Sequence, residues 1–380
     1  MSRLFTRLRR GGRGVIVAAA ASAALGSGVV AGAPAASAST DCQWQPLSLQ
    51  NGWHSEQSAW NSGDPAYCID NGIVYVSGSL AQSRGSSGTY FAQLPQQYRP
   101  ASNMYLTVYT YAGTAGGVVR IDTDGTMHAY GGAATSFTSL AGISFPAAAL
   151  GTGQLLTPLQ NGWQSADSQW GTGDPSYHIN NGVVHLSGSL DQPGTSWWTF
   201  SQMPEAARPA HDQFIDVYAY GGAVGVLQVN NSFSNGPDGG GEIGAGNGAA
   251  ADMFTSLAGV TYPAATSAET PLQVLNGWQS GEGHSGAIGH GPSYYLSNGV
   301  VYLDGAVLNT GSGAVAVLPP DARPTHTLYL TVGTGFTNNY SASLQINPDG
   351  SIYIFGIPSN VNNTPNDWTV FSGISFEAGE

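Results

Sequence analysis

Residues 67–78 read YCIDNGIVYVSG, and the same pattern returns as YHINNGVVHLSG at residues 177–188 and as YYLSNGVVYLDG at residues 294–305. Each copy places an Asn-Gly pair between two runs that are rich in β-branched and aromatic residues. Both central residues of a type I′ turn need a positive φ, which asparagine and glycine tolerate best. The pattern therefore predicts the same antiparallel hairpin three times in one chain.

Other blocks recur together with the hairpin. Asn-Gly-Trp begins at Asn51, Asn161 and Asn276, and a Leu-Pro or Met-Pro pair, an Arg-Pro pair and a closing apolar strand follow in each copy. The period is about 110 residues, which is the size of a small domain rather than of a solenoid repeat. We therefore predict three tandem domains. Their expected boundaries are residues 39–147 for repeat 1, 158–264 for repeat 2 and 271–380 for repeat 3.

The strand signals within each repeat predict the fold class. Short alternating runs are separated by Gly, Asn, Asp and Pro, and no stretch keeps a helical period of 3.6 residues. About eight short strands in a domain of this size are typical of two packed antiparallel sheets. We expect an all-β protein of three tandem antiparallel β-sandwich domains with a jelly-roll-like arrangement.

Two residue types occur at matching places in all three repeats, so a shared fold explains them. The tryptophan of each Asn-Gly-Trp is expected to plug one end of its sandwich, with a ligand platform as the alternative. Each Arg-Pro arginine is expected to tie a loop by hydrogen bonds to carbonyl oxygens, with a binding role as the alternative. These residues are Trp53, Trp163, Trp278, Arg99, Arg208 and Arg323.

The segment 1–38 is typical of a secretory signal peptide. It begins with five arginines and no acid, continues as an apolar run from Val15 to about Ala31, and ends in Ala36-Ser37-Ala38. A transmembrane anchor is the alternative, although the run is rich in Gly, Ala and Ser. We expect a secreted or extracellular protein, with attachment to the cell surface left open.

The charged residues of the chain argue against a nucleic-acid partner and against two kinds of chemistry. It carries 23 acidic and 10 basic residues for a net charge of −13, and every basic residue is an arginine. Nucleic-acid binding needs clustered Lys or Arg, so we expect no nucleic-acid partner. The P-loop mechanism and Schiff-base catalysis both need a lysine amine and are excluded.

Cys42 and Cys68 are the only cysteines. An even pair in an exported chain predicts one disulfide, and two buried free thiols are the alternative. The bond would close a loop of about 27 residues and contribute on the order of 3 kcal/mol by loop entropy.

Catalytic patterns are missing from the sequence. Asp64 and Asp174 lie in a shared Gly-Asp-Pro, but repeat 3 has His290-Gly291-Pro292 there, so the carboxylate pair of a glycosidase does not occur in every repeat. The eight histidines show neither HExxH nor another metal-ligand spacing. We expect no catalytic residue, no cofactor and no metal, with an enzyme whose site spans repeats as the alternative.

An aromatic surplus is the strongest functional signal. Exposed aromatic rings beside carboxylates and amides suit sugars, because flat C–H faces stack on the ring while hydroxyls form hydrogen bonds. Trp197 and Trp198 occur in repeat 2 alone, in the loop after its Ser-Gly-Ser-Leu strand. Adjacent side chains of an extended segment point to opposite faces, so we expect at least one of the two to be exposed. The candidate ligand-binding residues are Trp60, Asp64, Trp170, Asp174, Trp197 and Trp198.

The chain resembles the small β-sandwich head domains at the C-termini of phage tail fibres and related receptor-binding proteins. The resemblance covers nearly all of residues 46–378, once per repeat, and its residues are Ser77–Leu80, Asn298–Leu303, Leu318-Pro319, Arg323-Pro324, Leu328–Val332 and Gly373–Phe376. Such heads typically bind cell-surface saccharides and assemble as trimers. The resemblance implies a saccharide ligand and suggests that the three repeats pack as an intrachain pseudo-trimer.

These observations predict a secreted, non-catalytic carbohydrate-binding or adhesion protein, whose partner is a polysaccharide or a cell-surface glycan. A structural protein of the envelope or extracellular matrix without a specific ligand is the first alternative. A polysaccharide hydrolase is the second.

Overall fold

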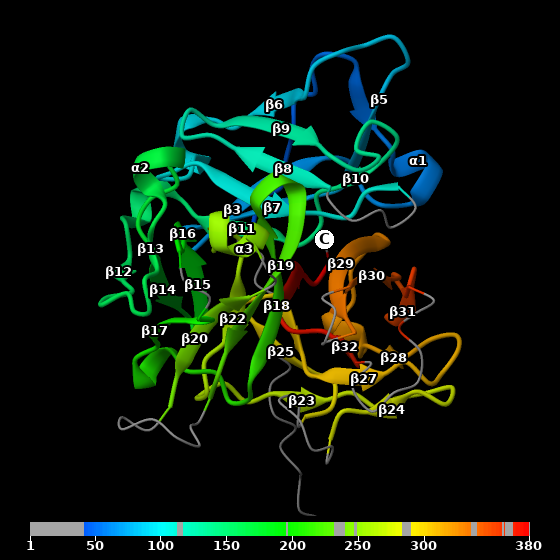
Figure 1. Ribbon diagram of the computed structural model, residues 1–380. Helices are drawn as coiled ribbons and strands as arrows, with labels where there is room; N and C mark the ends of the chain where they lie inside the picture. The colour runs from blue at the N-terminus through cyan, green and yellow to red at the C-terminus, as the bar shows by residue number, and fades with distance from the viewer. Residues whose placement is uncertain are drawn as a thin grey trace, which may run out of the picture. The chain divides into compact units, whose positions relative to one another are not determined.

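The computed structural model describes residues 42–111, 117–194, 197–231, 240–246, 249–282, 290–335, 340–358, 361 and 368–379. The expected signal peptide at residues 1–38 lies outside them. Antiparallel strands dominate the described residues, and the helices among them are single short turns (Figure 1). The expected all-β class with a sandwich-like fold is confirmed, whereas the tandem jelly-roll arrangement stays a prediction.

The strands follow the same order in each repeat, and 3₁₀ turns are labelled η. Repeat 1 contains β1 (Gln45–Pro46), β2 (Trp53–Ser55), α1 (Gln57–Trp60), β3 (Ala66–Asp70), β4 (Ile73–Ser77), β5 (Ser79–Gln82), β6 (Tyr90–Gln93), η1 (Gln96–Tyr98), β7 (Met104–Thr107), β8 (Val118–Ile121), β9 (Thr126–Tyr130), β10 (Thr138–Ser139) and β11 (Ile143–Pro146), and η3 (Ala148–Leu150) follows it.

Repeat 2 shows the same succession of strands. From β12, just before it, to its end the elements are β12 (Gln154–Leu155), β13 (Gln164–Ser165), α2 (Asp167–Trp170), β14 (Ser176–Asn180), β15 (Val183–Ser187), β16 (Ser189–Asp191), β17 (Thr199–Gln202), η4 (Glu205–Ala207), β18 (Gln213–Ala219), η5 (Tyr220–Gly222), β19 (Ala223–Val229), β20 (Glu242–Gly246), α3 (Ala249–Met253), β21 (Thr255–Ser256) and β22 (Thr261–Pro263).

Repeat 3 completes the series. Its elements are β23 (Thr270–Pro271), β24 (Gln279–Ser280), β25 (Ser293–Ser297), β26 (Val300–Asp304), β27 (Ala306–Leu308), β28 (Ala316–Val317), η6 (Pro320–Ala322), β29 (Leu328–Thr334), β30 (Tyr340–Ile346), β31 (Ser351–Phe355), β32 (Trp368–Val370) and β33 (Ile374–Glu377).

Each repeat builds one four-stranded sheet in the same order, β1-β3-β4-β11, β12-β14-β15-β22 and β23-β25-β26-β33. The remaining strands form one seven-stranded sheet in repeat 2 and another in repeat 3, and a three-stranded and a four-stranded sheet in repeat 1. A separate apolar core lies in each repeat. The tryptophans Trp53, Trp163 and Trp278 are buried in these cores, as expected.

The three predicted hairpins are confirmed. Strand β3 pairs with β4, β14 with β15, and β25 with β26, all antiparallel. The asparagine of each turn has a φ near 50°, and the following glycine has a φ near 80°. A β-branched residue at either position would be strained, so the Asn-Gly pair sets the register of each four-stranded sheet. The asparagines are Asn71 (φ 48°), Asn181 (φ 49°) and Asn298 (φ 51°).

The arginines of the three Arg-Pro pairs act as expected. The Nε–H of Arg99 donates to the carbonyl oxygen of Leu94 at 3.1 Å, and that of Arg208 donates to Met203 at the same distance. Arg323 donates to the carbonyl oxygen of Leu318 at 2.9 Å. In each repeat the guanidinium therefore ties the segment after the Leu-Pro or Met-Pro pair back onto the chain.

Aromatic clusters join each repeat to another one, within the compact unit formed by Ala38–Glu380. Each cluster contains an aromatic residue near the start of one long strand, which is β7, β18 or β29. In the same cluster, an aromatic residue of another repeat lies at the start of β32 or just before β21 or β10. Strand β18 contacts both β7 and β29 (Figure 1). The pairs are Tyr105 with Phe254, Phe214 with Trp368, and Tyr329 with Phe137.

Backbone hydrogen bonds support two of these joints. The amide of Asn103 in repeat 1 donates to the carbonyl oxygen of Gly171 in repeat 2 at 2.9 Å. At the matching positions, the amide of Thr327 in repeat 3 donates to Asn61 in repeat 1 at 2.7 Å. Related residues thus make the contact from repeat 1 to repeat 2 and from repeat 3 to repeat 1.

Cys42 and Cys68 form the expected disulfide, with a sequence separation of 26. We expect the double substitution Cys42→Ala and Cys68→Ala to lower the free energy of unfolding by about 3 kcal/mol, because the unfolded chain regains the freedom of the closed loop. Urea denaturation followed by tryptophan fluorescence measures this loss. Reduction of the native protein with dithiothreitol should reproduce it, and equal stability of the oxidised and reduced chains would contradict the prediction.

Within the described residues, no helix has both the length and the apolar character needed to cross a membrane.

Candidate functional site

The loop between β16 and β17 presents two adjacent tryptophans. The side chain of Trp197 is 68% exposed and that of Trp198 is 38% exposed. An exposed indole keeps a large apolar area in contact with water, and neighbouring exposed apolar side chains often mark a binding surface. The expectation that at least one ring is exposed is confirmed.

Hydrogen bonds from neighbouring residues fix the backbone of this loop. The indole Nε1–H of buried Trp163 donates to the carbonyl oxygen of Trp197 at 2.7 Å, and Gln192 Nε2 donates to the same oxygen at 2.9 Å. The amide of Ala245 on β20 donates to the carbonyl oxygen of Trp198 at 2.9 Å. The two side chains therefore extend from a backbone fixed by three hydrogen bonds.

Glycine makes room for the second ring. A Cβ atom on Gly244 of β20 would lie 1.7 Å from a ring carbon of Trp198, so only glycine fits beneath this indole. In the other repeats the corresponding carbonyl oxygens, which accept the indole N–H of Trp53 and Trp278, belong to Gly88 and Gly313. The exposed tryptophan pair is thus a feature of repeat 2 alone.

Trp60 and Trp170, the other tryptophans of the candidate set, are partly buried at joints between repeats. The ring centroid of Trp60 lies 5.9 Å from that of Tyr329 in repeat 3 and 5.2 Å from Phe137. Trp170 lies 6.3 Å from Tyr105 of repeat 1. Their role in ligand binding stays a prediction, and the structure gives both a packing role.

The two candidate aspartates are exposed. Asp64 accepts a hydrogen bond from the hydroxyl of Ser55 at 2.6 Å. Asp174 lines a groove of about 300 Å³, whose other wall includes Pro100 and Ser102 of repeat 1. A carboxylate beside an open groove can accept hydrogen bonds from hydroxyl groups, so Asp174 keeps its place as a predicted ligand residue.

A second polar cluster lies between repeats 2 and 3, and the sequence patterns did not indicate it. The imidazole rings of His211 and His290 stack with centroids 3.9 Å apart. His290 Nε2 lies 3.7 Å from Glu269 Oε2 and 3.4 Å from Asp304 Oδ2. The one sequence signal was the replacement of Gly-Asp-Pro by His290-Gly291-Pro292 in repeat 3.

The ionisable groups of this cluster shift one another's pKa values. Burial raises the pKa of Glu269, and the nearby Asp304 carboxylate raises it further. Burial alone would lower the pKa of His290, but the carboxylates of Asp304 and Glu269 raise it overall. Burial and the neighbouring His290 lower the pKa of His211, which favours its neutral form.

A small cavity of about 80 Å³ is lined by matching residues of all three repeats. Thr107, Asp216 and Thr331 occupy the same position on β7, β18 and β29, and all three line it. Burial raises the pKa of Asp216 to about 7, although a hydrogen bond from Ser341 at 3.0 Å opposes the shift. The cavity is too small for a sugar ring but large enough for water.

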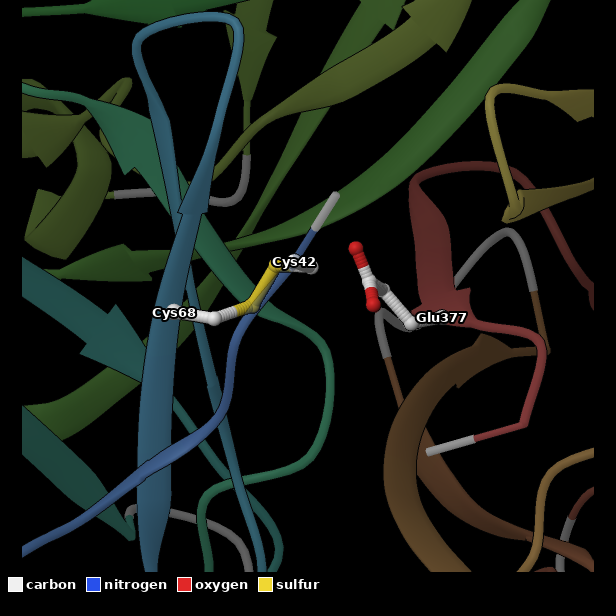
Figure 2. A group of neighbouring side chains, drawn as sticks. All are labelled: Cys42, Cys68 and Glu377. Carbon is white, nitrogen blue, oxygen red and sulfur yellow. A yellow bond between two sulfur atoms is a disulfide. The ribbon is translucent and has the colours of Figure 1, made fainter. Parts of the chain in front are cut away.

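Glu377 at the end of β33 lies beside the disulfide of repeat 1, with its carboxylate turned toward Cys42 and Cys68 (Figure 2). Burial raises the pKa of Glu377 to about 8, and the carboxylate of Asp70 in repeat 1 contributes to the shift. Both cysteines are oxidised, so they offer no thiolate to a metal ion.

Comparison of the chain with protein-family models, with curated proteins and with solved structures finds no match. The function is therefore argued from the residues and their geometry.

Proposed function

We propose that this chain is an exported, non-catalytic carbohydrate-binding or adhesion protein with three β-sandwich modules. Its ligand would be a polysaccharide or a cell-surface glycan. The observation that carries the proposal is the exposed tryptophan pair Trp197 and Trp198, whose backbone carbonyl oxygens accept three hydrogen bonds.

The geometry suits a sugar because it is organised before the ligand arrives. A loop held by buried donors loses little conformational freedom on binding, so less of the contact energy is spent on ordering it. The indole face offers apolar area to the C–H face of a pyranose, and the affinity does not depend on ion pairs. Salt therefore has little effect on this mode of binding.

The tryptophan pair occurs in one repeat, so we place one principal sugar site in each chain. Gly88 and Gly313 supply the matching carbonyl groups of repeats 1 and 3 and carry no side chain that a sugar ring could stack on. Repeats 1 and 3 would then support the binding module or contact the ligand through their own loops.

We expect Trp197→Ala to weaken polysaccharide binding by at least tenfold, which corresponds to about 1.4 kcal/mol or more. The substitution removes the most exposed indole while Trp163 and Gln192 keep their carbonyl acceptor, so the fold is retained. Pull-down with cellulose, chitin, xylan and mannan, together with a glycan array, identifies a bound glycan. Titration with that glycan then measures the affinity of each variant.

Tyr353→Ala is the matched control, because Tyr353 is an exposed aromatic residue on β31 of repeat 3. It should leave binding unchanged. Equal affinities of the Trp197→Ala variant and the wild-type protein would remove the proposed site. A wild-type protein that binds none of the glycans would instead favour a structural role in the envelope or extracellular matrix.

We further propose that the three repeats pack as an intrachain pseudo-trimer. Three observations support this arrangement: an aromatic cluster at each of the three joints, the matching backbone bonds at two of them, and an apolar cluster to which all three repeats contribute. The shared cluster contains Cys68, Ile73, Tyr75, Val183, Val300 and Tyr302.

A further inference from the structure

We propose that the groove between repeats 1 and 2 is a second sugar site, which takes one neutral pyranose residue of a glycan. The groove has a volume of about 300 Å³, and its walls include Ser102 of repeat 1 and Asp174 of repeat 2. This volume is at the lower end of the range for ligand pockets, as expected for a single sugar residue. The inference rests on the proposed function, because it takes the ligand to be a carbohydrate, and it adds a site apart from the tryptophan loop.

Small residues leave the groove open at this joint. A serine of repeat 1 meets a glycine of repeat 2, and a Cβ atom on the glycine would lie 2.8 Å from the serine hydroxyl. The matching residues are two stacked histidines between repeats 2 and 3, and a histidine packed over a glycine between repeats 3 and 1. At both of those joints an imidazole therefore occupies the place that stays open here. The pairs are Ser102 with Gly173, His211 with His290, and His326 with Gly63.

Polar side chains of the groove keep their hydrogen-bonding capacity for a ligand. Asp174, Ser176 and Ser187 of repeat 2 all line it. Among the described residues, none forms a hydrogen bond with the carboxylate or the hydroxyls of these three side chains. Ser176 is only 3% exposed, so its hydroxyl depends on the groove for a hydrogen-bond partner.

The matching polar groups of the other repeats already have partners within the protein. The hydroxyl of Ser293, which matches Ser176, donates to a glutamate carboxylate at 2.6 Å. The carboxylate of Asp64, which matches Asp174, accepts a hydrogen bond from a serine hydroxyl at 2.6 Å. The same kinds of side chain are therefore satisfied internally in repeats 1 and 3 and left free at the groove, where a ligand can bond to them.

The groove chemistry suits a neutral, hydroxylated ligand. Serine hydroxyls donate and accept, and a carboxylate accepts, so together they can bond to the hydroxyls of a sugar. The described residues that line the groove include no arginine, and the chain has no lysine, so a phosphate, sulfate or carboxylate on the ligand would lack a counter-charge. Pro100, Met104 and Leu155 add apolar area for the C–H groups of the ring.

Single-sugar probes test the groove separately from the tryptophan loop. The methyl glycosides of glucose, galactose, mannose and N-acetylglucosamine are each added to the full chain, and saturation-transfer NMR titrations measure their dissociation constants. We expect at least one probe to bind both the wild type and Trp197→Ala, because Trp197 does not line the groove. The methyl glycoside of glucuronic acid should bind more weakly than that of glucose, since its carboxylate meets the negative charge of Asp174.

Ser102→His is the decisive variant, because it fills the groove as the other repeats do. We expect it to weaken binding of the probe by at least about tenfold. The fold should be retained, since the ring of His326 already lies 3.0 Å from the position of a Cβ atom on Gly63 at the matching place. Ser102→Ala leaves the groove open and should weaken binding far less. Asp174→Asn keeps the side-chain size and should weaken binding, whereas Asp321→Asn, at an exposed site in repeat 3, is the control and should bind like the wild type.

Circular dichroism shows whether each variant is folded before titration. Unchanged probe binding in folded Ser102→His overturns the groove site and leaves the tryptophan site standing. Loss of all probe binding in Trp197→Ala does the same, because the binding would then belong to the tryptophan loop. A wild-type protein that binds none of the probes also overturns the groove site, and the polysaccharide pull-down then decides the proposed function independently.

Discussion

Replacement of Phe254 by alanine is expected to lower the free energy of unfolding by about 3–5 kcal/mol. Phe254 is only 2% exposed, and its ring centroid lies 5.6 Å from Tyr105 of repeat 1 and 5.2 Å from Trp170. The substitution removes a whole ring from a packed cluster and leaves a space that Tyr105 and Trp170 border. Urea denaturation measures the loss.

A double-mutant cycle measures how much of this free energy comes from the interaction between residues of the two repeats. We expect Phe254→Ala and Tyr105→Ala to couple by about 0.5–1.5 kcal/mol, because their rings meet edge to face. Phe200→Ala is the control, since Phe200 is fully buried in the core of repeat 2 alone. It should be equally costly but additive with Tyr105→Ala. Additivity in both cycles would mean that the repeats do not stabilise one another at this joint.

The second large effect is a pH dependence that originates at Glu377. Its pKa is raised from an ordinary value near 4.5 to about 8, first by burial and then by the Asp70 carboxylate. Between these two values the folded state keeps a proton that the unfolded state releases. The contribution of Glu377 to the free energy of unfolding is therefore fully present below about pH 4.5. It is lost as the pH rises through about 8, and the free energy of unfolding falls by up to about 1.4 kcal/mol per pH unit on the way.

Glu377→Gln should remove this dependence. The amide is neutral at every pH, so we expect the variant to be more stable than the wild type at pH 8 and similar to it at pH 5. Denaturation curves at several pH values measure the difference, which separates Glu377 from Asp216 and from other acids that titrate in the same range. Glu205→Gln, at an exposed site in repeat 2, is the control, and its stability should change with pH as that of the wild type does. If the stability of Glu377→Gln changed with pH as that of the wild type does, Glu377 would not be the origin of the pH dependence.

Features that depend on short-range chemistry could be predicted from the sequence. The three Asn-Gly hairpins follow from backbone sterics at two residues, and the arginine ties span five residues along the chain. The Cys42–Cys68 bond followed from the pairing of the only two cysteines. In each case the partners are close in sequence or have no competitor, so few alternatives remain.

The candidate site could be predicted only in part. The adjacency of Trp197 and Trp198 indicated that at least one is exposed, which the structure confirms. Trp60 and Trp170 carry the same residue type, yet their rings pack at joints against residues of another repeat. The choice between a sugar platform and a packing role depends on the neighbouring surface, which the sequence of a single repeat does not contain.

By itself the sequence determined the all-β class, the threefold repetition, the hairpin registers and the disulfide, because local sterics and periodicity encode them. Tertiary structure alone decided which side chains from distant segments meet. It placed His211 against His290 and brought Glu377 beside the disulfide. The physical reason is that packing between sheets depends on shape and burial over the whole unit, so chemistry at the joints arises from residues that no local pattern connects.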